Sequence, residues 1–111
     1  MISCRFGDVI LVPFPFTDQT SSKRRPAVVV SSSAHIRGTG DLVILAISSR
    51  RSRPVDLEVR DWQEAGLLKP SVFKPVVTTI ESSLILKKLG ALTGRDLSTL
   101  RQMIDFLLSG S

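Results

Sequence analysis

The stretch from Gly7 to Val30 reads GDVILVPFPFTDQTSSKRRPAVVV, and it decides how the rest of the chain is interpreted. Two apolar, β-branched runs, VILV and VVV, predict a pair of strands. Their connection is longer than the roughly two to five residues of a simple hairpin, and long connections on a rigid scaffold are often functional. It ends in the cations KRR, directly before Pro26, which is expected to open the second strand. This arrangement is typical of a site that holds an anion.

The composition is that of one small globular domain. The chain has 111 residues, 42% of them hydrophobic, and a slightly positive mean hydropathy, which favours a folded chain over a disordered one. We therefore expect residues 1–111 to form a single domain. No apolar run approaches the ~18 residues of a membrane span, and the first residues lack the apolar segment of a signal peptide. The cytoplasm is the expected location, with no membrane partner.

Metal-ligating residues are scarce. Cys4 is the single cysteine and His35 the single histidine, whereas protein metal sites are built from clusters of such ligands. A lone cysteine builds no internal disulfide, which fits a reducing compartment. We expect no metal and no cofactor, an inert thiol at Cys4, and no catalytic duty for His35.

The positive charge is concentrated in the centre of the sequence. The net charge is +5. Residues 23–53 alone carry +6, and the remainder carries −1. Such a segment is expected to bind a phosphate backbone, and its excess of arginine over lysine favours bidentate phosphate contacts. The alternative interpretation is a solvated basic face. The candidate RNA-binding residues are Lys23, Arg24, Ser49, Arg50, Arg51 and Arg53, with Phe16 as a candidate for stacking on a base.

The pattern of the whole chain predicts a mainly-β (α+β) fold. Consecutive apolar residues in VVV and in LVILAI indicate strands buried on both faces, as in a barrel. Expected strands cover residues 8–14, 27–32, 41–48, 55–59, 72–80 and 88–92, with a turn-rich loop at 33–40 and a turn at 81–83. In the strand at 55–59, Val55, Leu57 and Val59 alternate with Asp56 and Glu58, which is typical of a half-buried strand with its carboxylates towards solvent. Pro75 indicates a sheet edge or a bulge. The fold predicted is a small, partly open β-barrel with a C-terminal amphipathic helix.

Two caps are predicted around helical segments. Asp61 is expected to cap one helical turn at residues 61–66, where Trp62 would seal the end of the barrel. Thr93 is expected to cap the final helix, with Asp96 at the spacing of a capping box. The apolar face of that helix would consist of Leu97, Leu100, Met103, Ile104, Leu107 and Leu108.

Strand pairing brings two chemically useful residues together. If the second and third strands pair antiparallel, the start of one lies beside the end of the other. Arg25 precedes the second strand and Ser48 ends the third. We therefore expect the guanidinium of Arg25 near the hydroxyl of Ser48.

An ordered series of segments carries a family resemblance. GDV, VPFPFTD, RRPAVVVSS, LAISS, LLKPSV and KKLGALT follow one another over nearly the whole chain. In this series the sequence resembles the MazF/PemK family, the toxin endoribonucleases of bacterial toxin–antitoxin pairs. The resemblance implies an SH3-like barrel of the CcdB/Kid/MazF kind and a two-fold homodimer. It also implies single-stranded RNA as substrate, cleaved to a 2′,3′-cyclic phosphate and a 5′-hydroxyl, and a cognate antitoxin as protein partner.

The resemblance also implies a catalytic pair. The family's arginine before the strand-two proline matches Arg25, and its hydroxyl residue at the end of strand three matches Ser48. The family commonly has threonine there, and serine lacks the β-branch that fixes the rotamer. Ser49 therefore remains an alternative source of the hydroxyl.

Two other function classes are open from the sequence. A non-catalytic RNA-binding barrel would need the basic residues but not the pair of Arg25 and Ser48. A toxin that targets a protein, similar to the CcdB gyrase poisons, would act through C-terminal residues that include a tryptophan. The only tryptophan here is Trp62, which argues against the second class.

Overall fold

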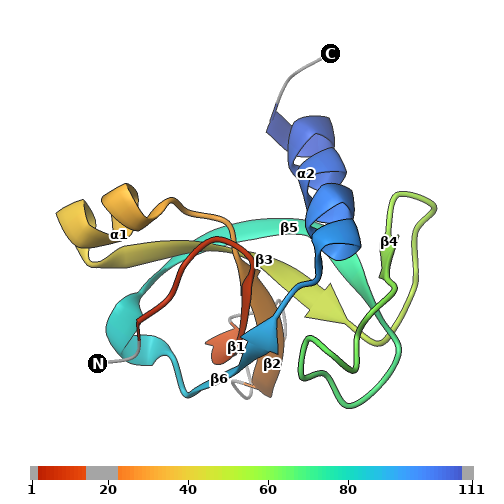
Figure 1. The fold of residues 1–111 in the computed structure, drawn as a ribbon, viewed down its shortest axis with the longest axis horizontal. Coiled ribbons are helices and arrows are strands. Elements are labelled where there is room, and N and C mark those ends of the chain that lie inside the picture. Colours follow the sequence, from red (N-terminus) through yellow and green to blue (C-terminus); the bar gives the residue numbers. More distant parts are fainter. Residues whose placement is uncertain (1–2, 15–22, 109–111) are drawn as a thin grey trace.

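The computed structural model describes residues 3–14 and 23–108. Along these ranges the elements are β1 (Asp8–Phe14), β2 (Lys23–Val29), α1 (Ser33–Thr39), β3 (Asp41–Ser48), β4 (Leu57–Val59), β5 (Ser71–Glu81), the 3-10 helix η1 (Ser82–Leu84), β6 (Lys87–Ala91) and α2 (Gly94–Leu108). The strands pair antiparallel in the order β4-β5-β3-β2-β1-β6. The sheet is strongly curled (Figure 1). The predicted mainly-β, partly open barrel with a C-terminal helix is confirmed.

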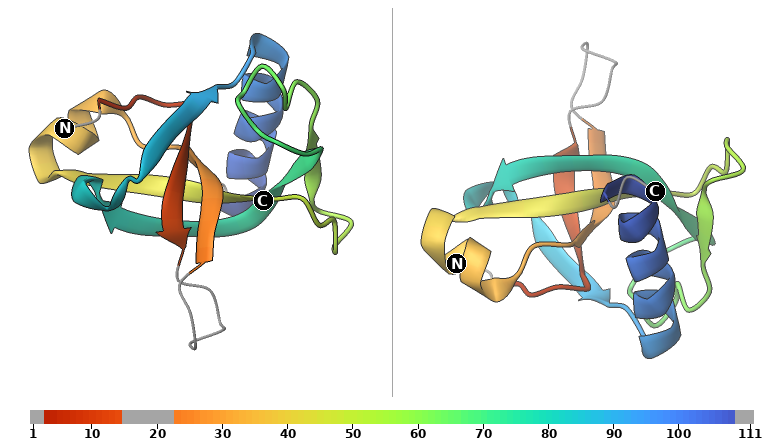
Figure 2. Two further views of the ribbon diagram at one scale, coloured as in Figure 1. Left: turned by 90° about the horizontal axis from the view of Figure 1, so that it is seen from below. Right: turned by 90° about the horizontal axis from the view of Figure 1, so that it is seen from above.

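The central strands are apolar on both faces because each face covers its own core. Val9 and Val28 belong to one core, whereas their neighbours Ile10 and Ala27 belong to the other. Helix α2 closes the first core through the fully buried Leu100 and Met103. Helix α1 lies at the other end of the sheet from α2, as all views show (Figure 2). The continuous valine and isoleucine runs thus reflect two-sided burial, as predicted.

The residues predicted to form the apolar face of α2 are buried or partly buried, except the last one, Leu108. Leu97, Ile104 and Leu107 pack against the first core. Leu108, the last residue of α2, is 72% exposed. None of the helices within residues 3–14 and 23–108 is long and apolar enough to cross a membrane.

The second strand begins earlier than predicted. The ladder with β1 extends to the pair Phe14 and Lys23, so the three cations lie inside β2 and not in the loop before it. Pro26 lies opposite Leu11, one residue before the ladder with β3 starts at Ala27. The missing N–H of proline therefore falls at the end of that ladder.

Residues 33–40, predicted as a loop, contain α1. The hydroxyl of Ser32 accepts a hydrogen bond from the backbone N–H of His35 and caps the first turn. Gly40 closes the helix with a φ of 76°, a left-handed conformation that suits glycine. The turn-forming residues that indicated a loop are the caps of a short helix.

The segment around β4 also differs from the prediction. The strand covers Leu57–Val59 and not 55–59. Asp56, expected on the solvent side, is fully buried. A helical turn does form, because the N–H of Ala65 donates to the carbonyl of Asp61, but the Asp61 carboxylate points to α2 and does not cap that turn. Trp62 packs against the first core, as predicted.

Two predicted irregularities are present. The pairing of β3 with β5 shifts between Leu45, opposite Val77, and Ile47, opposite Phe73. Two extra residues of β5 are accommodated around Pro75, which confirms the predicted bulge. A turn was expected at residues 81–83, and residues 82–84 form η1.

Candidate nucleic-acid interface

Arg25 and Ser48, which were predicted to be neighbours, lie near the start of β2 and at the end of β3. Val28 pairs with Leu45 and Ala27 with Ala46. Continuing this register along both strands places Arg25 opposite Ser48. Residues directly opposite in an antiparallel pair project from the same face of the sheet. Ser49 lies one residue beyond β3 and is outside the strand.

A cavity of about 660 Å³ opens at these strand ends. Its volume is within the range of pockets that hold small molecules. The second strand and the end of the third contribute Arg24, Arg25, Pro26, Ile47, Ser48 and Ser49. The other side is formed by residues 66–69, Ser71, Leu11 of β1, and Lys87 and Leu89 of β6.

The charge of this cavity has one sign. Four of its lining residues are cations, and we call them the cation rim: Arg24, Arg25, Lys69 and Lys87. Of the described residues that line the cavity, none is an aspartate or a glutamate. Arg25 is half-buried and its Nε atom is fully buried, so its side chain is held by the fold. A rim of this kind attracts an anion.

The hydroxyl of Ser48 has a defined position. Its Oγ accepts a hydrogen bond from the backbone N–H of Arg50, with an N–O distance of 3.1 Å. That contact uses a lone pair and leaves the hydroxyl hydrogen available for donation. The backbone of the following turn thus supplies the orientation that a β-branch would give in threonine.

The predicted RNA-binding arginines that follow β3 lie outside the cavity lining. Arg50, Arg51 and Arg53 are exposed, and their loop is held from inside by Asp56. Its carboxylate accepts hydrogen bonds from the N–H groups of Ser52 (2.9 Å) and Arg53 (3.0 Å).

Asp56 also forms a buried ion pair with Lys74 of β5. Burial raises the pKa of the Asp56 carboxyl, but the hydrogen bonds from Lys74, Ser52 and Arg53 lower it more, so the pKa lies below its usual value. The carboxylate therefore stays charged and fixes the exposed basic loop to the sheet.

One cation of the basic segment lies away from this cavity. Arg37, which contributes to the basic segment of the sequence, lies on α1 and lines a second cavity with Cys4. Burial is the main cause of a raised pKa of the Cys4 thiol. Lys23 is the first residue of β2. Phe16, the predicted stacking residue, lies outside the described residues.

Sequence reasoning missed two members of the cation rim. Lys69 belongs to LLKPSV and Lys87 to KKLGALT, but neither stands in the basic segment. The pairing of Leu11 with both Pro26 and Lys87 places Lys87 across β1 from the second strand. That pairing was not readable from the sequence, because β6 joins the sheet from the far end of the chain.

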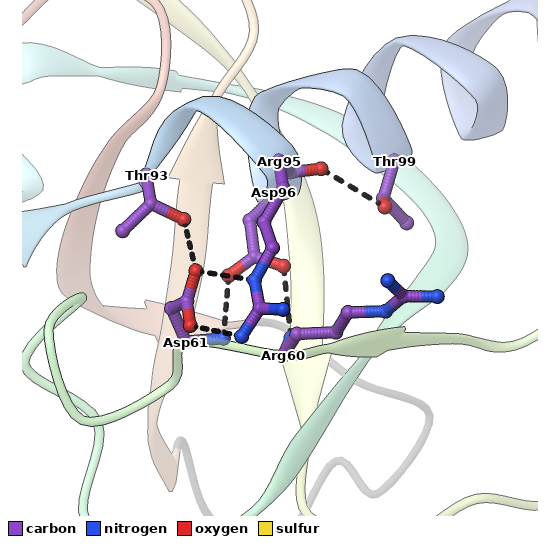
Figure 3. A network of polar contacts seen from close by, with 6 residues as sticks. All are labelled: Arg60, Asp61, Thr93, Arg95, Asp96 and Thr99. Atoms are coloured by element: carbon purple, nitrogen blue, oxygen red, sulfur yellow. Dashed lines mark hydrogen bonds and ion pairs between the residues drawn. The ribbon is translucent and has the colours of Figure 1, made fainter.

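A second cluster of charged residues ties β4 to the start of α2, and Figure 3 shows it. We call Arg60, Asp61, Thr93, Arg95 and Asp96 the α2 cap cluster. The buried Asp96 accepts the backbone N–H groups of Arg60 and Asp61, both at 2.8 Å. The carboxylate of Asp61 accepts hydrogen bonds from Thr93 and from the Arg95 guanidinium.

These contacts give the cap cluster internal charge balance. Hydrogen bonds from Arg95 and Thr93 lower the pKa of Asp61 to about 2. The same contact with Asp61 raises the pKa of Arg95. The capping-box spacing of Thr93 and Asp96 was recognised in the sequence, but both side chains bind the β4 turn, which lies more than thirty residues earlier.

No three His, Cys, Asp or Glu side chains of residues 3–14 and 23–108 gather into a set that could hold a metal ion. The independence of the reaction from metal ions stays a prediction.

Comparison with known proteins identifies the relatives of this fold. The model of the PemK-like, MazF-like toxin family of type II toxin–antitoxin systems matches residues 5–108. None of the curated protein sequences is similar enough to count as a match.

Solved structures of toxins have the same architecture. A MazE–MazF structure from Deinococcus radiodurans matches with a TM-score of 0.75 at 19% identity, covering 100% of both chains. A mycobacterial endoribonuclease in complex with its cognate antitoxin gives 0.74 at 17% identity, covering 98% of this chain and 96% of that one. The Mycobacterium tuberculosis toxin MazF-mt6 gives 0.71 at 17% identity, with 92% and 96% covered. The predicted MazF-like fold is thereby confirmed.

Proposed function

Because the chain belongs to the PemK-like, MazF-like toxin family of type II toxin–antitoxin systems, we propose that it is a sequence-selective endoribonuclease. Its substrate is single-stranded RNA, with messenger RNA as the expected target. The products are a 2′,3′-cyclic phosphate and a 5′-hydroxyl, and no metal ion takes part.

The observation that supports this proposal is the shared cavity at the strand ends. Arg25 and Ser48 both line the 660 Å³ cavity, whose lining carries four cations. A guanidinium can bind two non-bridging oxygens of one phosphate, and a hydroxyl can donate a third hydrogen bond. These are the groups needed where negative charge grows on a phosphate.

RNA brings its own nucleophile to this site. The 2′-oxygen forms a bond to phosphorus, the bond from phosphorus to the 5′-oxygen breaks, and one proton moves in net from the 2′-oxygen to the 5′-oxygen. The protein has to hold the three atoms in line and stabilise the extra charge on the phosphorane.

Each proposed catalytic group has one task. Arg25 stabilises the phosphorane, because a guanidinium group keeps its proton near neutrality and is a poor general acid or base. Ser48 donates its hydroxyl hydrogen to a phosphate oxygen, while the N–H of Arg50 fixes its lone pair. Protons exchange with solvent water at the open cavity. The exposed arginines at 50, 51 and 53 hold the RNA beyond the cleaved bond.

Partners follow from the family membership. We propose that a cognate antitoxin inhibits the protein by laying an acidic segment over the cation rim. We also propose a homodimer in the cytoplasm. Light scattering of the purified protein, alone and with its antitoxin, tests both assemblies.

The test of the function is incubation of the purified protein with a long single-stranded RNA in EDTA, followed by mapping of the new 5′ ends. We expect discrete cuts with 5′-hydroxyl termini, and no cuts with Arg25→Ala. Intact RNA that still shifts on a gel would instead identify a non-catalytic RNA-binding barrel. Intact RNA without a shift would favour a toxin with a protein target.

A further inference from the structure

Two lysines that line the cavity carry charges that the proposed reaction does not use. Lys69 follows the turn after β4, and Lys87 is the first residue of β6. Both side chains are exposed and both line the cavity. They are therefore within reach of any ligand that fills it.

The curvature of the sheet explains why Lys87 belongs to this cavity. Leu11 of β1 pairs with Pro26 on one side and with Lys87 on the other. Residues directly opposite across neighbouring strands share a face. Lys87, Leu11 and Pro26 therefore form one row across the sheet, and all three line the cavity. Strand alternation places Arg24 on this face and Arg25 on the other, and the cavity at the strand end is lined by both arginines.

Lys69 is held beside this row by close backbone packing. A Cβ atom on Gly66 would lie 2.1 Å from the carbonyl oxygen of Leu89, and one on Gly90 would lie 2.5 Å from that of Ala65. Glycine at both positions lets the turn touch β6 directly. The turn that leads to Lys69 therefore packs directly against β6, the strand that begins with Lys87.

Pairing distinguishes these lysines from the others. Among the lysines whose side chains the structure describes, Lys74 pairs with Asp56 and Lys88 pairs with Asp8. Lys69 and Lys87 have no carboxylate partner in the described part of the chain. Lys87 and Lys88 are adjacent in β6, so their side chains project from opposite faces of the strand. Lys88 pairs with Asp8, whereas Lys87 lines the cavity.

We propose that Lys69 and Lys87 form a second phosphate subsite, which binds the RNA backbone next to the cleaved bond. This inference rests on the proposed function and names the contacts that place the substrate in it. The neighbouring apolar lining, which includes Leu11, Pro26 and Leu89, gives the attached base a surface to contact. The lysines bind substrate and transition state equally, so they lower KM and leave kcat unchanged.

The salt dependence of binding tests the subsite without cleavage. The probe is a single-stranded 2′-O-methyl RNA, which lacks the free 2′-hydroxyl and cannot be cut. Its Kd is measured over a range of salt for the wild type and for the Lys69→Gln/Lys87→Gln double variant. The matched control is Arg5→Gln/Arg37→Gln, which also removes two exposed cations but lies away from the cavity.

Loss of two phosphate contacts should lower the slope of log K against log salt by about 1.4, since each contact to a single strand contributes about 0.7. The control should keep the wild-type slope, and Lys69→Arg/Lys87→Arg should restore it. An unchanged slope in the Gln variant, or an equal drop in the control, would overturn the subsite.

Cleavage kinetics separate this inference from the proposed function. If the wild type cuts RNA, the Gln variant should raise KM with kcat unchanged. A wild type that cuts while the variant keeps its KM and its salt slope refutes the subsite alone. A wild type that leaves RNA intact refutes the proposed function, and the binding slopes still decide whether the lysines contact phosphate.

Discussion

The cation rim and the α2 cap cluster show two uses of charge in one small protein. In the cap cluster, the carboxylates of Asp61 and Asp96 are bound by Arg95, Thr93 and backbone N–H groups. Around the cavity, four cations stand among lining residues that include no carboxylate. In the cap cluster, the negative charges have partners within the chain. The described lining of the cavity carries positive charge and no carboxylate, as expected where an anionic ligand binds.

This difference separates stability from binding. An internally balanced cluster holds elements together, and its loss should be visible in unfolding. The positive charges of the cation rim repel one another slightly, and binding of an anionic ligand compensates for that repulsion. Substitutions in the rim should therefore change binding and rate, and substitutions at paired carboxylates should change stability. The four predictions below test that separation.

The largest expected effect is that of Arg25→Lys. Lysine keeps the charge but loses the planar fork that binds two phosphate oxygens. We expect the cleavage rate to fall by about 100-fold or more, while the affinity for uncleavable 2′-O-methyl RNA stays within a few-fold. Single-turnover cleavage and filter binding measure the two quantities. A parallel loss of affinity and rate would make Arg25 a binding residue, and far-ultraviolet circular dichroism controls for folding.

Asp56→Ala should have the largest effect on stability. It removes an acceptor for the Ser52 and Arg53 N–H groups and leaves the Lys74 ammonium, whose side chain is 14% exposed, without its partner. Breaking a buried ion pair from one side costs about 3 kcal/mol. Urea unfolding measures this cost.

The matched control for Asp56→Ala is Glu58→Ala, which removes an exposed carboxylate from β4. Its effect should stay within about 0.5 kcal/mol. The double variant Asp56→Leu/Lys74→Met should recover part of the loss, because both charges are then gone. Equal effects of the two alanine variants would show that the buried pair does not stabilise the loop.

Local patterns predicted the strands and the final helix well. β1 and β3 have the predicted bounds, and the neighbourhood of Arg25 and Ser48 followed from antiparallel pairing alone. Residues 33–40 were misassigned because Ser32 and Gly40, which cap α1, are also turn formers. A short segment with such ends does not reveal whether its middle is helical.

Long-range contacts were the part that the sequence could not supply. The alternation around Asp56 predicted a solvent-facing carboxylate, whereas Lys74, eighteen residues later, draws it inward. Lys69 and Lys87 were overlooked because they join the cavity through the curl of the sheet and through the contact of Gly66 with β6. Binding residues contributed by remote strands leave no local pattern.

A smaller effect distinguishes the two serines. Ser48 ends β3 and lines the cavity with Arg25, and its Oγ is oriented by the N–H of Arg50. We expect Ser48→Ala to lower the cleavage rate about 10-fold or somewhat more, since it removes one hydrogen bond to a charged phosphate oxygen, worth about 1.5 kcal/mol or more. Ser49→Ala should stay within about two-fold of the wild type. The reverse order in single-turnover assays would assign the hydroxyl to Ser49.

The smallest expected effect is the pH dependence that Asp61 gives to stability. Hydrogen bonds from Arg95 and Thr93 lower the folded-state pKa of Asp61 from 3.8 to about 2. A carboxyl group with a depressed folded-state pKa stabilises the fold above its unfolded-state pKa and loses that contribution as pH falls. The difference in unfolding free energy between wild type and Asp61→Asn should therefore be constant above about pH 5 and shrink from there towards pH 2.

Urea unfolding between pH 2 and pH 6 measures that difference. Arg95→Gln provides a second variant, because it removes the partner and keeps the carboxylate; its curve should approach that of the wild type over the same pH interval. Neither substitution touches the cavity, so RNA cleavage at neutral pH should be unchanged as long as the variants are folded. If the Asp61→Asn curve runs parallel to the wild type throughout, or if cleavage falls while the fold is intact, the cap cluster is not the purely structural counterpart of the cation rim.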